Sequence, residues 1–148
     1  MSPFTTSREI PAAVPQVFAA ISHPDRLARW WGPAGFTNTF NVCEFKPGGN
    51  WVYVMHGPDG RNHRNESHFA EIDPPHGVVI RHISEPKYRL TIRLTPTADG
   101  GTLVSWSQAF DRPEAAARLE RIVVPANEQN LDRLTAEVLR DTNGLLCQ

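Results

Sequence analysis

The residues of this sequence that could carry out acid–base chemistry are His56, His82 and Glu66, each within a segment rich in β-forming residues. An imidazole can gain or lose a proton near neutral pH, and a carboxylate can act as a second acid or base. If these side chains faced one apolar cavity, they could orient a ligand or move protons on a bound substrate. Alternatively, the histidines hydrogen-bond backbone groups or lie at strand ends in water, because a buried polar group is costly unless it is paired.

Other reactive patterns do not have the spacing that their chemistry needs. The six histidines show no HxH, helical HxxxH or HExxH pattern, so we expect no metal site. The glycines of Gly48-Gly49 and Gly57-x-x-Gly60 lie between predicted strands and not before a helix, which argues against a phosphate-binding loop. No Ser-His-Asp or Cys-His arrangement is evident. We therefore expect no cofactor and assign no catalytic residue beyond the three candidates.

A larger group of residues could line a ligand cavity. Trp30 and Trp31 could form a gate, although aromatic pairs more often supply buried area in a core. Trp106 and Gln108 share one face of the last predicted strand and could supply a wall and a hydrogen-bond donor. The cavity candidates lie on the predicted strands and helices and are Trp30, Trp31, Phe36, Tyr53, Met55, His56, Phe69, His82, Trp106, Gln108, Leu131 and Leu134.

A sheet must position most of these residues. The pattern predicts a strand over residues 4–10, a short helix that starts near Pro15 and a second short helix that ends before Gly32-Pro33. Stretches rich in β-formers and separated by turns then predict strands within residues 36–46, 51–56, 65–73, 78–84, 88–95 and 102–110. Strands joined by such tight turns form an antiparallel meander.

The last third of the chain is predicted to be helical. Leu131, Leu134 and Val138 form one face of an amphipathic helix over residues 126–142, and Pro113 begins a helical run before it. We expect Pro125 to kink or split the helix, because proline has no N–H to donate. The fold class is therefore α+β, with a curved antiparallel sheet of about six to seven strands around a long C-terminal helix and two short helices after the first strand. A ligand cavity is expected between sheet and helix.

The composition suits a single domain over residues 1–148. Hydrophobic residues make up 40% and charged residues 21%, and the net charge is −1 with no basic run, so we expect no nucleic-acid partner. The apolar stretches are too short to span a bilayer, and the N-terminus lacks the apolar run of a signal peptide. We expect a cytoplasmic protein in which Cys43 and Cys147 are free thiols.

Four segments together resemble a known family. They are Arg29-Trp30-Trp31-Gly32-Pro33 with Gly35-Phe36-Thr37, Lys46-Pro47-Gly48-Gly49-Asn50-Trp51, Met55-His56-Gly57-Pro58-Asp59-Gly60, and Glu128-Gln129-Asn130-Leu131-Asp132-Arg133-Leu134. In this order they resemble the homologues of the activator of the ninety-kilodalton heat-shock-protein ATPase, within the START-like (SRPBCC) helix-grip superfamily. The resemblance covers roughly Arg8 to Val138. It implies a helix-grip fold with a ligand cavity, and its members include carriers, cyclase-like enzymes and co-chaperones.

Three functional hypotheses follow. The first is a module that carries, senses or sequesters a small apolar or aromatic ligand. The second is a cyclase- or hydratase-like enzyme that uses His56, His82 and Glu66 as general acid and base. The third is protein interaction, with a chaperone partner, and association into a homodimer is compatible with all three. The choice depends on which strand faces point inward, since a slip of one residue in register reverses every side chain.

Overall fold

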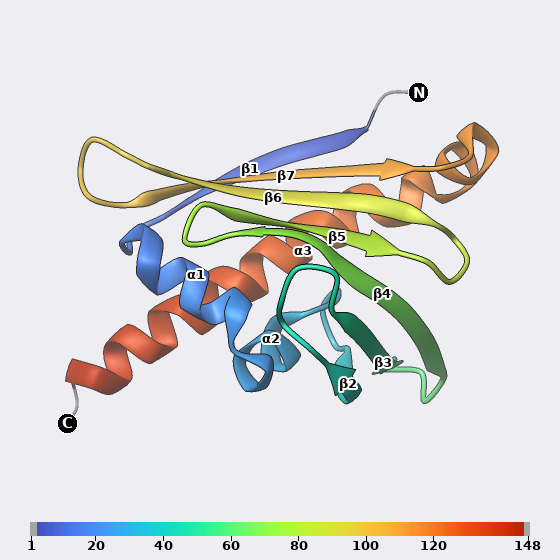
Figure 1. Ribbon diagram of the computed structural model, residues 1–148, viewed down its shortest axis with the longest axis horizontal. Coiled ribbons are helices and arrows are strands. Elements are labelled where there is room, and N and C mark those ends of the chain that lie inside the picture. Colours follow the sequence, from blue (N-terminus) through green and yellow to red (C-terminus); the bar gives the residue numbers. More distant parts are fainter. Residues whose placement is uncertain (1–2, 147–148) are drawn as a thin grey trace.

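Seven antiparallel strands form one curved sheet in the order β1-β7-β6-β5-β4-β3-β2. The computed structural model describes residues 3–146, with side chains described as far as residue 140. The strands are β1 (Phe4–Ile10), β2 (Thr37–Cys43), β3 (Asn50–His56), β4 (Asn62–Asp73), β5 (Gly77–His82), β6 (Tyr88–Pro96) and β7 (Thr102–Phe110). The helices are α1 (Val14–Ser22) and α2 (Pro24–Trp30), which follow β1, and the C-terminal α3 (Pro113–Leu146). The predicted α+β class and helix-grip arrangement are confirmed, and α3 crosses one face of the sheet (Figure 1).

Alternation along the strands decides which side chains face α3. On β6, Leu90, Ile92 and Leu94 are buried, and the residues between them are half-buried or exposed. The buried side of β7 carries Thr102, Val104, Trp106, Gln108 and Phe110. Register shifts on β2 and β4 mark β-bulges, which bend the sheet. The buried sides of the strands therefore form one concave inner face.

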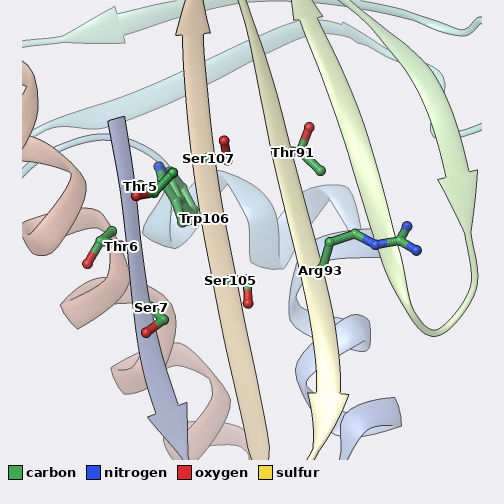
Figure 2. Close-up of a pocket in the computed structure, with 8 residues that line it drawn as sticks. All are labelled: Thr5, Thr6, Ser7, Thr91, Arg93, Ser105, Trp106 and Ser107. Atoms are coloured by element: carbon green, nitrogen blue, oxygen red, sulfur yellow. The ribbon is translucent and has the colours of Figure 1, made fainter. Parts of the chain in front are cut away.

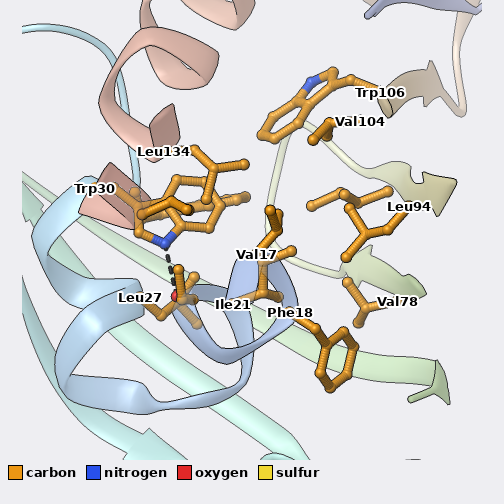
Figure 3. Packing of buried hydrophobic residues seen from close by; sticks show 14 of the residues in the cluster. Val17, Phe18, Ile21, Leu27, Trp30, Val78, Leu94, Val104, Trp106 and Leu134 are labelled. Carbon is orange, nitrogen blue, oxygen red and sulfur yellow. Dashed lines mark hydrogen bonds between the residues drawn. The ribbon is translucent and has the colours of Figure 1, made fainter. Parts of the chain in front are cut away.

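The two short helices fill one end of this inner face. Figure 3 shows where the three helices meet the sheet, through Val17, Phe18, Ile21, Leu27, Trp30, Val78, Leu94, Val104, Trp106 and Leu134. Burial of each large aliphatic side chain stabilises the fold by about 1.5–3 kcal/mol. The polar atom of Trp30 is satisfied within this core, because its Nε1 donates a hydrogen bond of 2.9 Å to the Ala20 carbonyl. The other end of the inner face, around Tyr88, is covered by the first half of α3.

The C-terminal helix continues through Pro125. The expectation that this proline would split the helix is wrong, because α3 is helical from Pro113 to Leu146. Pro125 and Arg121 are both exposed, so the Arg121 carbonyl that loses its N–H partner can be hydrated. Buried residues hold the helix on both sides of the proline, with Ala116 before it and Asn127 after it. Packing against the sheet thus outweighs the local preference of proline.

A buried carboxylate ties α3 to α2. Glu137 is 5% exposed and accepts hydrogen bonds from Arg26 Nε at 2.9 Å, Arg29 Nε at 3.0 Å and Arg140 Nη2 at 3.0 Å. Burial alone would raise the pKa of this carboxyl, but the hydrogen bonds from Arg29, Arg140 and Arg26 outweigh burial and lower the pKa to about 2. Glu137 is therefore ionised at neutral pH and links the two helices.

Replacing the helical proline should stabilise the protein. Pro125→Ala restores a backbone N–H to α3, so we expect the free energy of unfolding to rise by about 1–3 kcal/mol. Urea denaturation measures this change. Glu120→Ala, at an exposed position of the same helix, is the control and should change the free energy by less than about 0.5 kcal/mol. If the urea midpoint of Pro125→Ala equals that of the wild type, Pro125 does not lower the stability of α3.

The hydrogen bonds to the ionised Glu137 carboxylate should make the stability of the protein depend on pH. The depressed pKa means that the stabilisation is complete above the ordinary glutamate pKa of 4.5 and is lost as the pH falls toward about 2. Glu137→Gln removes this titration, so its unfolding free energy should fall less steeply over that pH range than that of the wild type. Urea denaturation at each pH measures both slopes. The exposed variant Glu120→Gln should keep the wild-type slope. A wild-type slope for Glu137→Gln would show that the ionised Glu137 carboxylate does not stabilise the fold.

Candidate functional site

A cavity of about 130 Å³ lies between the inner face of the sheet and the first half of α3. Its sheet wall consists of Met55, Tyr88, Leu90, Trp106 and Gln108. Its other walls come from the segment that follows α2 and from α3, through Trp31, Gly32, Pro33, Val123, Ala126, Asn127 and Asn130. None of the residues that line it carries a formal charge at neutral pH. The cavity therefore has the uncharged, mainly apolar lining that is typical of ligand sites.

The cavity has a buried floor and an accessible rim. The buried floor consists of Trp31, Gly32, Leu90, Trp106, Gln108, Asn127 and Asn130. The rim residues are half-buried and are Pro33, Met55, Tyr88, Val123 and Ala126. A small molecule can thus approach between α3 and the segment that follows α2.

Arg133 holds the segment after α2 against α3. Its guanidinium donates hydrogen bonds of 2.9–3.2 Å to the backbone carbonyl oxygens of Arg29, Trp31, Gly32, Pro33 and Phe36. Burial lowers the pKa of this guanidinium, and the carbonyl oxygens replace its lost hydration. These bonds join the first and the fourth of the segments that resemble the family. Two sequence motifs about a hundred residues apart thus form one wall of the cavity.

Asn130 reinforces the same wall. Its Oδ1 accepts a hydrogen bond of 3.3 Å from the Gly32 N–H, and its Nδ2 donates one of 3.0 Å to the Trp30 carbonyl. Gly32 has a φ of 100°, and a Cβ at this position would lie 2.8 Å from Met55 Cε. The positive φ requires glycine here, and a side chain at this position would in addition displace the end of the Met55 side chain. The wall is therefore held by main-chain bonds and has little freedom to move.

A few polar groups lie along the floor. Asn127 Nδ2 donates a hydrogen bond of 3.1 Å to Gln108 Oε1. The indole N–H groups of Trp31 and Trp106 are buried, and neither has a hydrogen-bond partner among the described residues. An apolar site with a small number of placed polar groups is the usual composition of a pocket that orients its ligand.

Two tyrosine hydroxyls near the floor stay protonated at neutral pH. Burial raises the pKa of Tyr53 to about 12, and the nearby polar groups of Trp31, Ser67 and Tyr88 act in the opposite direction, although the Trp31 N–H and the Ser67 hydroxyl make no regular hydrogen bond among the described residues. Burial also raises the pKa of Tyr88, and its neighbour Tyr53 raises it further. Of the two, only Tyr88 lines the cavity. Both phenols can donate a hydrogen bond, and neither is set up to act as a base.

His82 lies on the inner face but behind Tyr88. It is 2% exposed, and its ring stacks on that of Tyr88 with centroids 4.4 Å apart. Its Nδ1 lies 2.8 Å from the Pro86 carbonyl and its Nε2 lies 2.7 Å from Asn65 Oδ1. Burial lowers the pKa of this imidazole, against a smaller effect of the Pro86 carbonyl. His82 therefore supports the Tyr88 ring and does not border the cavity.

The other two acid–base candidates lie on the outer face. His56 is half-buried, with its Nε2 2.7 Å from Thr39 Oγ1 and its Nδ1 2.7 Å from Asn62 Oδ1. Glu66 accepts a hydrogen bond of 2.6 Å from Arg64. Strand alternation is the reason, because the neighbouring residues on β3 and β4 are the buried ones. The structure therefore does not bring His56, His82 and Glu66 to one point.

The remaining cavity candidates fall into two groups, and Phe36 belongs to neither. Trp31, Met55, Trp106 and Gln108 line the cavity. Trp30, Tyr53, Phe69, Leu131 and Leu134 are buried in the hydrophobic core. Phe36 lies before β2, half-buried, with its ring centroid 6.3 Å from that of His63.

Several lining residues were not among the sequence candidates. Tyr88 and Leu90 could have been found, because they alternate on the same face of β6 as the other buried residues. Asn127 and Asn130 are spaced three apart and lie beside the apolar residue Leu131, which is a sign of polar groups turned inward. Gly32, Pro33, Val123 and Ala126 carry no such signal.

A second hollow, of about 460 Å³, lies on the opposite face of the sheet. Figure 2 shows its lining, which is mostly short hydroxyl side chains, with Thr5, Ser105 and Ser107 among them, and the cationic Arg93. The Trp106 ring is turned away from this hollow, behind β7. All of its other lining residues are half-buried or exposed, so the hollow has no buried floor. The inner cavity is the better candidate for a ligand site.

The described residues contain neither a cluster of metal-ligating side chains nor a membrane-spanning helix. Among them, no three His, Cys, Asp or Glu side chains gather in a way that could hold a metal ion. No helix in residues 3–146 combines the length and the apolar character needed to cross a membrane. Cys43 is a free thiol, and Cys147 lies outside the described residues.

The family follows from the sequence. Residues 11–138 match the family model described as Activator of Hsp90 ATPase homolog 1-like protein. The chain belongs to this family. The family resemblance predicted from the four sequence segments is thereby confirmed, and the fold is that of the START-like (SRPBCC) superfamily. A search among curated protein sequences found no match.

Solved structures share the fold of the AHSA1-like protein at low sequence identity. A solution structure of an Arthrobacter aurescens protein is 25% identical, with a TM-score of 0.84 over 93% of this chain and 86% of that one. A Nitrosomonas europaea protein is 19% identical, with a TM-score of 0.86 over 96% and 97% of the two chains. The AHSA1 protein of Silicibacter pomeroyi is 20% identical, with a TM-score of 0.73 over 95% and 99%.

Removing the Arg133 guanidinium should destabilise the AHSA1-like protein. Arg133→Met keeps the length of the side chain but leaves the carbonyl oxygens of the segment after α2 without their donor. We expect a loss of about 2–4 kcal/mol in the free energy of unfolding, measured by urea denaturation. Arg118→Met, at an exposed position of α3, is the matched control and should cost less than about 0.5 kcal/mol. Equal losses for the two variants would show that the wall does not depend on Arg133.

Proposed function

We propose that this protein binds a small, mainly apolar ligand in the cavity between the sheet and the first half of α3. The supporting observation is the combination of a buried aromatic floor, formed by Trp31 and Trp106, with a half-buried rim. The cavity volume of about 130 Å³ is close to that of apolar protein cavities that admit benzene. The ligand is therefore of the size of a single ring.

The rigidity of the wall supports binding by a site that is already formed. The bonds from Arg133 and Asn130 hold the segment after α2, and α1 and α2 fill the rest of the inner face. A site that needs little reorganisation loses less free energy on binding. The proposed ligand thus meets a cavity that exists before it arrives.

Binding without chemical conversion suits the arrangement of side chains. A general acid and base must lie within hydrogen-bond reach of the same substrate. His82 is engaged behind Tyr88, and His56 and Glu66 are hydrogen-bonded on the outer face. We therefore propose a carrier, sensor or sequestering role, as first hypothesised.

Filling the cavity should abolish binding. We expect toluene, as a single-ring probe, to raise the melting temperature of the wild type, because a ligand that binds the folded state stabilises it. Ala126→Phe places a ring in the cavity from α3 and should weaken toluene binding at least about tenfold. Thermal unfolding over a toluene series measures both.

The control is Ala117→Phe, which adds the same ring at an exposed position of α3. It should leave toluene binding unchanged. The proposal fails if toluene does not stabilise the wild type, or if it stabilises Ala126→Phe to the same extent. Native mass spectrometry of protein purified from cells then identifies the natural ligand as an excess mass that disappears on denaturation.

A further inference from the structure

A pair of buried amide side chains lies on the wall of the cavity. Gln108, on the inner face of β7, is 8% exposed, and Asn127, on α3, is 9% exposed. Asn127 Nδ2 donates a hydrogen bond of 3.1 Å to Gln108 Oε1, so both side chains extend into the space between α3 and the sheet. Both residues line the cavity. The pair thus places amide groups on an otherwise mainly apolar wall.

Their single hydrogen bond leaves one end of each amide unused. A carboxamide has an NH₂ group, which donates, and a carbonyl oxygen, which accepts. Among the described residues, neither side chain makes a hydrogen bond other than the one that joins them. The Gln108 Nε2 group and the Asn127 Oδ1 atom are therefore a donor and an acceptor without a partner there. If both amides turned by half a rotation, the free donor and the free acceptor would only exchange residues.

The free ends of the two amides can be reached by solvent. Within the described part of the chain, the side-chain polar atoms that have neither a partner nor accessible surface belong to Trp31, Asn38, Trp51, Ser67 and Trp106. Gln108 Nε2 and Asn127 Oδ1 have no partner and are not among these atoms, so each keeps some accessible surface. The amide pair differs in this respect from the indole nitrogens, which a ligand cannot reach.

The cavity is the space beside the pair that can hold a ring. Asn127 also borders a hollow of about 30 Å³ near β1, which has room for no more than one or two water molecules. The cavity, of about 130 Å³, is larger and is the space that Asn127 shares with Gln108. Leu90, opposite Gln108 in the register of β6 and β7, and Trp106, on the same face of β7, also line it. Apolar side chains thus flank the amide pair.

A hydroxyl group matches the free ends of the pair. Its oxygen accepts a hydrogen bond and its proton is donated, so one ligand atom can serve both Gln108 Nε2 and Asn127 Oδ1. Accessible amide groups are hydrated in the free protein, and a ligand that displaces water without replacing its hydrogen bonds loses affinity. A methyl group replaces neither bond, and a carbonyl oxygen replaces only the bond from the donor.

The lining also favours a neutral ligand. None of the residues that line the cavity is charged at neutral pH. A carboxylate or an ammonium group would lose its hydration there without gaining a counter-charge. A ring hydroxyl avoids this cost, because a phenol such as the tyrosine side chain keeps its proton at neutral pH.

From the amide pair and the uncharged lining we infer that the ligand is a neutral, single-ring alcohol or phenol, whose hydroxyl group accepts a hydrogen bond from Gln108 and donates one to Asn127. The inference rests on the proposed function and specifies the class of its ligand. The apolar walls hold the ring, and the amide pair fixes the position of the hydroxyl group.

Phenol and toluene are matched probes, because they have nearly the same shape and differ in a hydroxyl or a methyl group on the ring. Titration of the ¹⁵N-labelled protein gives the affinity of each probe and follows the side-chain NH₂ signals by NMR. Gln108→Met identifies the Gln108 NH₂ signal by its loss. We expect phenol to move this signal further downfield than toluene does, because the ring currents of the two probes are nearly equal and only phenol forms the hydrogen bond.

Substitutions separate the hydrogen bonds from changes in the shape of the cavity. Gln108→Met and Asn127→Leu keep the approximate size of each side chain, and any change in shape affects both probes. The ratio of phenol affinity to toluene affinity should fall about threefold to tenfold in each variant, because each removes one of the two bonds. Asn41→Leu makes the same substitution at an exposed position of β2 that does not line the cavity, and it should leave the ratio unchanged.

The outcomes distinguish this inference from the proposed function. A fall of the ratio in both variants shows that the ligand oxygen both accepts and donates, and so supports a neutral hydroxyl group. If neither phenol nor toluene binds the wild type, the proposed function itself is wrong. If toluene binds but phenol does not, or if the ratio falls in only one variant or in neither, the ligand class is wrong and the proposed function stands.

Discussion

Arg133 connects the parts of the molecule that would otherwise be independent. Its guanidinium, half-buried on α3, donates to the Arg29 carbonyl in the last turn of α2 and to four carbonyl oxygens of the segment between α2 and β2. That segment has no regular secondary structure of its own, and its carbonyl groups need donors wherever they are shielded from water. The Arg133 side chain thus supplies hydrogen-bond donors to the carbonyl oxygens of this segment and sets the distance between the segment and α3. The cavity exists because this distance is held while the sheet curves away beneath.

The two ends of the inner face of the sheet are covered by different helices, and this difference affects the cavity. Where α1 and α2 meet the inner face, aliphatic and aromatic side chains pack together in one hydrophobic core. Where α3 covers the sheet alone, the floor consists of large rings and amides, whose rigid shapes pack less completely. The apolar driving force for folding is therefore concentrated at one end of the sheet. The other end can carry unpaired donors at a cost that the well-packed end offsets.

The fold was predictable from the sequence to a greater extent than the site. Alternation around Leu90, Ile92 and Leu94 and the glycine-rich turns indicated the strands, because these signals are local. Which side chains of β3 point inward was not predictable. The cavity candidates Tyr53, Met55 and His56 include residues from both faces of this strand. Only the pairing of β3 with its neighbours decides between them. Pro125 was misjudged for a related reason, because its local preference is overridden by packing on both sides.

The distance along the chain between the partners of the cavity wall also bears on when the cavity forms. The bonds between Gly32 and the side chains of Asn130 and Arg133 span about a hundred residues. Contacts of such long range form late, after the intervening strands have been made and paired. During synthesis the sheet can begin to assemble while its inner face is still open, and the pocket is complete only when α3 has left the ribosome. A ligand of the proposed kind would therefore meet a complete pocket only after α3 has been synthesised.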